Sequence, residues 1–170
     1  MRKFLWCLLV MMQSAYAANP IDDFSKTGPF KLFEVTAPDT PTPYMTGYIP
    51  ETNECHLLVN VSVDRPTGLA DTVAVAHELG HCYSLRLKVQ QIDGGVTQYG
   101  EAFGDVFALA WISKNMPAQL DAAMELLWGM RSMNRMINPA YNTMFIMRRA
   151  RLSLPTTMSP EQFTVTFLGS

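Results

Sequence analysis

Apolar residues alternate with polar ones in the first part of the chain and recur at helical intervals in the second part. Strict alternation is typical of a half-buried strand, and a 3.6-residue period is typical of an amphipathic helix. The alternating runs predict strands over residues 30–37, 44–49 and 55–63. The helical runs predict helices over residues 69–87, 98–115, 118–130 and 139–151. The expected fold is therefore α+β, with a short sheet that precedes the helices.

The segments outside these runs are predicted from composition and turn chemistry. Residues 19–27 are polar and predict a loose lead-in, whereas residues 163–167 alternate and predict a terminal strand. Prolines in residues 38–43 predict a connection between strands, because proline donates no ladder hydrogen bond. The sequence Asp93-Gly94-Gly95 favours a chain reversal between the first two helices.

Two of the three histidines lie four residues apart on the helix expected over residues 69–87. Positions i and i+4 share one face of a helix, so the imidazoles of His77 and His81 can reach one metal ion. Glu78 is about 100° round the helix from His77. This His-Glu-x-x-His pattern is typical of zinc peptidases, in which the glutamate is the general base. The alternative is a chance surface cluster on an amphipathic helix.

Catalytic zinc usually takes three protein ligands, so a third is expected from elsewhere in the chain. The metzincin pattern fails because its third histidine would fall on Leu87. Downstream carboxylates are the remaining candidates: Asp93, Glu101, Asp105, Asp121, Glu125 and Glu161. Glu101 and Asp105 stand out because they share a helix face at i and i+4, so that one can bind metal while the other supports a ligand.

Residues 73–109 resemble the gluzincin zinc metallopeptidases, and their two motifs are similar to those of the thermolysin family. In that family the third ligand is a glutamate 20 positions after the second histidine, where this chain has Glu101. The resemblance implies a small zincin-like domain with one Zn²⁺ ion on His77, His81 and Glu101. It also implies that Asp105 orients His77, and that Glu78 activates a zinc-bound water for peptide hydrolysis.

The chain departs from the thermolysin pattern after the second motif. No histidine follows His81, so the group that stabilises the oxyanion is unassigned, and the short chain is closer in size to the minigluzincins. The residues that could donate a hydrogen bond to an oxyanion are Tyr99, Tyr141, Arg148, Arg149 and Arg151.

The N-terminus predicts a signal peptide over residues 1–17. Arg2 and Lys3 precede an apolar run that is too short to span a membrane, and Ala15-Tyr16-Ala17 is a cleavage-site pattern. The expected product is one exported domain, residues 18–170, without stable membrane insertion, in a periplasm or outside the cell. The formal net charge is −2 and becomes more negative on cleavage, which disfavours nucleic acid as a partner.

Two cysteines, Cys55 and Cys82, remain after cleavage. An even number of cysteines in an exported chain predicts a disulfide between strand 55–63 and the metal-binding helix, and two buried thiols are the alternative. In gluzincins the last strand before that helix tends to bind the substrate backbone, so this strand is either that shelf or an interior strand. His56, on its polar face, has no partner at metal-binding spacing and is not assigned to the site.

These patterns lead to an exported zinc-dependent peptidase whose partner is a peptide or protein substrate. The alternative from another class is a catalytically inactive zinc-binding module with a zincin fold, and a weaker one is a structural zinc protein. A structural site prefers four protein ligands and gives no role to Glu78. Neither cleavage specificity nor oligomeric state follows from the sequence.

Overall fold

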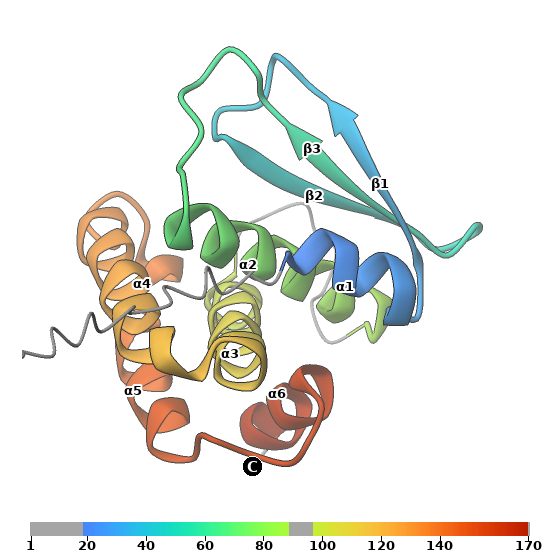
Figure 1. The fold of residues 1–170 in the computed structure, drawn as a ribbon. Helices are drawn as coiled ribbons and strands as arrows, with labels where there is room; N and C mark the ends of the chain where they lie inside the picture. Colours follow the sequence, from blue (N-terminus) through green and yellow to red (C-terminus); the bar gives the residue numbers. More distant parts are fainter. Residues whose placement is uncertain (1–18, 89–96, 170) are drawn as a thin grey trace, which may run out of the picture.

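The computed structural model describes residues 19–88 and 97–169 (Figure 1). Helix α1 and three strands come first: α1 (Pro20–Thr27), β1 (Lys31–Thr36), β2 (Tyr44–Ile49) and β3 (Glu54–Val59). Five longer helices follow: α2 (Leu69–Arg86), α3 (Gln98–Asn115), α4 (Leu120–Asn134), α5 (Met144–Leu152) and α6 (Pro160–Gly169). The predicted α+β class is confirmed, with the sheet before the main helices. The expected signal peptide (1–17) and the expected reversal at 93–95 lie outside the described residues.

The sheet has the strand order β1-β3-β2, so β3 lies in the middle. β1 runs parallel to β3, and β2 runs antiparallel to it. Cys55, Leu57 and Val59 of β3 are buried, as the alternation predicts. Because both sides of β3 are paired, the expectation that it offers a free edge to substrate is wrong, and the interior-strand alternative is correct. Within the described residues, β2 has the free edge nearer to α2.

Helix α3 is the central element of the helical layer. The sheet lies on one side of α2, and α3 packs against the other side (Figure 1). α4, α5 and α6 then surround α3, whose residues 100–113 are all buried. A helix that is apolar on nearly every face must be covered on every face. The sequence of α3 therefore places its two carboxylates, Glu101 and Asp105, inside the protein rather than at its surface.

Two segments differ from the expected secondary structure. Residues 19–27 form α1 rather than a loose lead-in, because Asn19 accepts a hydrogen bond from the Ile21 amide and Pro20 begins the helix. Residues 163–167 belong to α6 rather than to a strand. Phe163 and Phe167 stack on each other within this helix. Their spacing of four residues fits an alternating strand pattern, but it also places both rings on one face of a helix.

The helices expected over 118–130 and 139–151 each begin with a short 3₁₀ turn. Pro117–Gln119 precedes α4, which extends to Asn134, and Pro139–Tyr141 precedes α5. No helix among the described residues is long and apolar enough to cross a membrane.

A disulfide joins Cys55 of β3 to Cys82 of α2, as the sequence predicts. Both cysteines are fully buried, and the bond fixes α2 to the middle strand one residue after His81. Structural disulfides form and persist in oxidising compartments. This bond is therefore compatible with an exported protein.

Candidate metal centre

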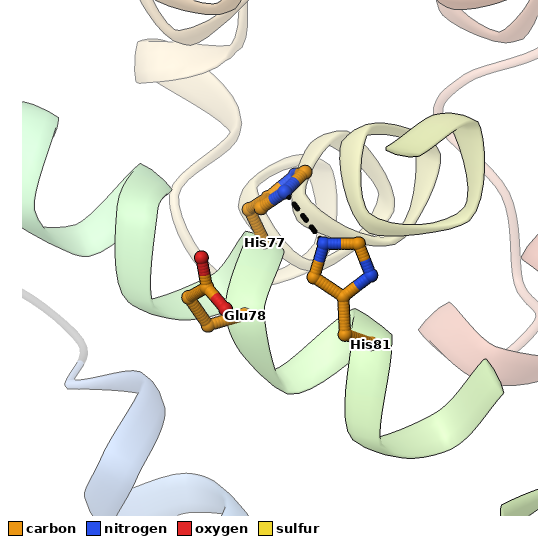
Figure 2. Close-up of side chains that lie close together, drawn as sticks. All are labelled: His77, Glu78 and His81. Carbon is orange, nitrogen blue, oxygen red and sulfur yellow. Dashed lines mark hydrogen bonds between the residues drawn. The ribbon is translucent and has the colours of Figure 1, made fainter. Parts of the chain in front are cut away.

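His77, Glu78 and His81 lie together on α2, and each offers a ligand atom within 4.8 Å of the others. Figure 2 shows the two imidazoles turned toward each other, with the Glu78 carboxylate to one side of His77. The Nε2 atoms of His77 and His81 are 3.0 Å apart. Both histidines point from α2 toward α3. This cluster could hold one metal ion.

Two glycines allow α2 and α3 to approach closely at this point. A Cβ atom on Gly80 would lie 2.9 Å from the Cα of Gly104, and a Cβ on Gly104 would lie 2.6 Å from the His77 ring. Only glycine fits such contacts without displacement of its neighbours. The close crossing brings Glu101, one turn before Gly104, to the two histidines.

The Glu101 carboxylate reaches both imidazoles from α3. Its oxygens lie 3.5 Å from His77 Nε2 and 3.7 Å from His81 Nε2. Zinc bonds of 2.0–2.1 Å in tetrahedral geometry separate neighbouring donor atoms by about 3.3 Å. The 3.0 Å between the imidazole nitrogens is close to that value. The other two distances join different oxygens of Glu101 to the two imidazoles, so Glu101 lies beside the histidine pair, and Glu78 is the carboxylate with a ligand atom within 4.8 Å of both histidines.

Asp105 orients His77 from behind. Its carboxylate lies 3.0 Å from Nδ1 of His77, which leaves Nε2 facing His81 and Glu101. Burial alone would raise the pKa of Asp105, but the hydrogen bond with His77 and the charge of Arg131 hold that pKa well below its usual range. Thr143, at the start of α5, donates a further hydrogen bond to Asp105. The fully buried carboxylate is therefore ionised and holds one tautomer of His77.

The pKa values of the two histidines are shifted in opposite directions. Burial and the neighbouring His77 lower the pKa of His81 to about 3, so His81 is neutral at pH 7. Burial also lowers the pKa of His77, but the hydrogen bond to Asp105 and the charges of Asp105 and Glu101 outweigh that effect and raise it overall. To bind a cation, the Nε2 atoms of both imidazoles would have to be unprotonated.

Arg131 of α4 is the charged site residue that the sequence patterns did not identify, and Thr46 and Thr143 are two uncharged ones. Arg131 is buried, and its guanidinium donates to both oxygens of Asp105, with distances of 2.8 Å from Nε and 2.6 Å from Nη2. The same Nη2 lies 2.9 Å from Glu101 and 3.2 Å from His77 Nε2. A signal for it exists, because Arg131 continues the buried stripe at 120, 123 and 127 at helical spacing. A charge at a core position indicates a buried ionic partner.

Glu78 is held by a residue of β2. The Thr46 hydroxyl lies 2.9 Å from the Glu78 carboxylate and 3.1 Å from its backbone carbonyl. Burial raises the pKa of Glu78 to about 7, although the charge of His77 and the hydrogen bond from Thr46 oppose the shift. A carboxyl with a pKa near 7 can accept and donate a proton at neutral pH. Thr46 also places the free-edge strand β2 directly beside this carboxylate.

Of the other residues considered from the sequence, some lie near the metal cluster and others lie far from it. The Tyr141 ring lies 5.3 Å from the Arg131 guanidinium, and Glu101 and Glu78 act electrostatically on its hydroxyl, which places Tyr141 beside the site. Arg149 stacks on Phe167 instead, and Arg151 pairs with Asp121 at the surface. His56 pairs with Glu54 on the sheet and lies outside the cluster, in agreement with the sequence analysis, which did not assign it to the site.

The remaining residues named from the sequence are not in the cluster. Tyr99 and Arg148 are exposed. Asp121 is largely exposed in its surface pair, and Asp93 lies outside the described residues. Of the downstream carboxylates that the structure describes, Glu101 and Asp105 are the two that reach the histidines.

The chain was compared with models of protein families, with curated proteins and with solved structures, and none of the three comparisons found a match. Any functional inference must therefore come from the site itself.

Proposed function

We propose that this chain is an exported zinc-dependent peptidase. The observation that carries the proposal is the convergence of His77 and His81 from α2 with Glu101 from α3, beside a second glutamate, Glu78, that Thr46 orients. The three ligands would be the two Nε2 atoms and the Glu101 carboxylate. The Cys55–Cys82 disulfide supports an oxidising compartment.

The choice of zinc follows from the donor set. Imidazole and carboxylate ligands together suit an ion of intermediate hardness such as Zn²⁺. Two histidines with one glutamate are a ligand set found in catalytic zinc sites. Bound zinc would supply Lewis acidity toward a peptide carbonyl and would lower the pKa of a water molecule to about 7.

Glu78 has the position and the proton affinity of the general base. In its ionised form it takes a proton from the attacking water, and in its protonated form it gives that proton to the leaving amine. Its pKa, raised to about 7 by burial, allows both steps at neutral pH. Thr46 keeps the carboxylate from turning toward solvent.

Asp105 and Arg131 would not bind the metal themselves; they position the proposed ligands His77 and Glu101. Asp105 holds His77 through Nδ1, so that Nε2 is the ligand atom. Arg131 joins Asp105 to Glu101 and limits the movement of both carboxylates. Tyr141, beside Arg131, is the sequence-named donor best situated for a developing oxyanion.

The substrate would bind along β2 rather than β3. β2 is an edge strand within the described residues, and its Thr46 contacts Glu78. An extended peptide can add to a free edge through backbone hydrogen bonds. This arrangement brings a peptide bond next to Glu78 and favours extended, unfolded substrates.

The test combines metal content with hydrolysis of a diverse peptide mixture, with and without a chelator. The variant Glu78→Gln should bind one zinc ion per chain and lose hydrolysis by several orders of magnitude. The variant Glu101→Gln should lose zinc, whereas Asp121→Asn, which removes an exposed carboxylate, should retain both properties. Hydrolysis by Glu78→Gln at the original rate would refute the role of Glu78.

A second candidate, an inactive zinc-binding module, is favoured by one contact. Arg131 Nη2 lies 2.9 Å from Glu101, so the proposed third ligand is already paired with a cation. This candidate predicts stoichiometric zinc without chelator-sensitive hydrolysis of any peptide in the mixture. The two candidates are distinguished by the same experiment.

A further inference from the structure

The connection between α4 and α5 and the outer face of α5 expose large apolar side chains. Met136 and Ile137, in the connection, are 87% and 83% exposed, and Phe145 and Leu152, on α5, are 72% and 82% exposed. Scattered single apolar residues on a surface need no explanation, but several within one short segment do. α4 and α5 lie together along one side of the molecule (Figure 1).

The same segment is strongly basic although the chain as a whole is acidic. No aspartate or glutamate occurs between Glu125 and Glu161, a stretch that contains Arg131, Arg135, Arg148, Arg149 and Arg151. Arg131 is neutralised inside the protein and Arg151 pairs with Asp121. The remaining three arginines are exposed, and within the described residues no ion pair is formed by any of them.

Two apolar and two basic side chains of α5 share one face of the helix. Phe145, Arg148, Arg149 and Leu152 stand at i, i+3, i+4 and i+7, so they form one stripe. All four are exposed, while Met147 and Ala150 are buried against the protein. The stripe is therefore an outward face, although the Arg149 guanidinium lies 5.7 Å from the Phe167 ring of α6 at one side of it.

We propose that this surface, formed by Met136, Ile137, Phe145, Arg148, Arg149 and Leu152, binds the surface of an anionic lipid bilayer. The arginines face the negatively charged headgroups, and the apolar side chains enter the boundary between headgroups and acyl chains. Neither the arginines nor the apolar side chains would bind a membrane strongly alone, and stable peripheral binding generally needs two such contributions. The chain would lie on the membrane without crossing it.

The form of the surface favours a bilayer over a protein or a nucleic acid. The four apolar side chains of this surface are 72–87% exposed, so they project from the protein far enough to enter the headgroup region. A nucleic acid would use the arginines but would have no use for Met136 and Ile137. Binding to a bilayer surface increases with the apolar area that enters the lipid and with the attraction of basic side chains to anionic headgroups, and this surface offers both.

The connection that carries Met136 and Ile137 is anchored at both ends to a residue beside the candidate metal centre. The chain from Arg131 to Thr143 contacts Asp105 at both ends, and Met136 and Ile137 lie between those two contacts. Membrane attachment would therefore hold the candidate metal centre close to the lipid surface. The attachment does not depend on metal or on hydrolysis, so its test is independent of the proposed function.

The experiment measures binding of the full chain to vesicles by cosedimentation at about 0.1 M salt. Vesicles of phosphatidylcholine with phosphatidylglycerol should bind the chain, and vesicles of phosphatidylcholine alone should bind it more weakly. Each arginine near an anionic surface contributes about fivefold in affinity, so Arg148→Gln with Arg149→Gln should weaken binding by about 25-fold. Met136→Ser with Ile137→Ser should weaken it by about tenfold.

The matched control removes two exposed charges elsewhere, with Lys26→Gln and Lys114→Gln, and should change binding less than threefold. All variants share the same N-terminal segment, so differences between them report on this surface alone. Unchanged melting temperatures would show that the variants fold. Equal loss in the lysine control, or no loss in the arginine variant, would overturn the proposal. Binding to polyglutamate as tight as binding to vesicles would assign the surface to an acidic protein instead.

Discussion

Arg131 and Glu101 meet inside the protein, with the Nη2 atom of the arginine 2.9 Å from the carboxylate. The same guanidinium holds Asp105 through two hydrogen bonds. One buried cation thus joins two buried carboxylates that α3 carries one turn apart. A metal ion on Glu101 would add a second cation to this group, so the arginine and the ion share the same negative charge.

Replacement of Arg131 by methionine should destabilise the metal-free protein by about 3–5 kcal/mol, because it leaves two buried carboxylates without their partner. Added zinc should restore a larger part of the free energy of unfolding in this variant than in the original chain, since the ion compensates Glu101. Chemical denaturation with and without zinc measures both effects.

The control for this prediction is Arg151→Met. Arg151 pairs with Asp121 at the surface, where an ion pair contributes about 0–1 kcal/mol. This variant should unfold at nearly the original denaturant concentration, with or without zinc. A loss of stability in Arg151→Met equal to that in Arg131→Met would contradict the assignment of Arg131 to a buried network.

The Cys55–Cys82 disulfide should stabilise the fold by about 3.5 kcal/mol, the value expected when a bond closes a loop of this length. The double variant Cys55→Ala with Cys82→Ala should lose that amount in chemical denaturation, and the original chain under reducing conditions should lose a similar amount. Identical unfolding curves for the oxidised and reduced chains would contradict a structural role for the bond.

Local patterns were sufficient for the fold and for the motif of α2. The apolar alternation predicted all three strands, although β3 ends at Val59 rather than at residue 63, and the helical period predicted α2 and α3 to within one residue. The failures, α1 and α6, are short segments; Asn19 and Pro20 give α1 a local start signal, and packing then stabilises the helix. Phe24 is buried against Tyr83 and Phe107, contacts that no local pattern within residues 19–27 could reveal.

The long-range part of the site could not be predicted in this way. The position of Glu101 depends on the close approach of Gly80 and Gly104, which a sequence shows only as two small residues. Arg131 reaches Asp105 across 26 positions, and Thr46 reaches Glu78 across 32. These contacts are set by the packing of whole elements, whereas the His-Glu-x-x-His motif is set by one helical turn.

The packing at Gly104 leads to a sharp test. Alanine at this position would bring its Cβ to 2.6 Å from the His77 ring, which Asp105 and Arg131 already contact at Nδ1. The ring must therefore turn or α3 must shift. Zinc affinity should fall by about 10- to 100-fold, the usual effect of disturbing the groups that orient a ligand. Competition with a fluorescent zinc chelator measures the change.

The control for Gly104→Ala is Gly129→Ala on α4, where a Cβ would have no atom within 4 Å. Zinc affinity should remain unchanged in this variant, and the helix should gain up to about 1 kcal/mol from the better helix propensity of alanine. Unchanged zinc affinity in Gly104→Ala, with a normal circular dichroism spectrum, would exclude His77 as a ligand in the orientation described.

The final prediction concerns the pH dependence of stability in the metal-free protein. Burial raises the pKa of Glu78 from 4.5 to about 7, so between these values the folded chain retains a proton that the unfolded chain has lost. The contribution of Glu78 to the free energy of unfolding therefore declines as pH rises from about 4.5 to 7, and the full penalty applies above pH 7. The penalty is at most about 3 kcal/mol, and it is smaller to the extent that solvent screens the partly exposed carboxylate.

Glu78→Gln removes this titration while it keeps the size of the side chain. Compared with the original chain in the presence of a chelator, the variant should have equal stability at pH 4 and greater stability at pH 8. Denaturant titrations at a series of pH values measure the difference, with His56→Gln as a control because His56 lies on the sheet away from Glu78. A difference that is constant from pH 4 to pH 8 would mean that the folded protein does not retain the proton on Glu78, and that another group must supply proton transfer at neutral pH.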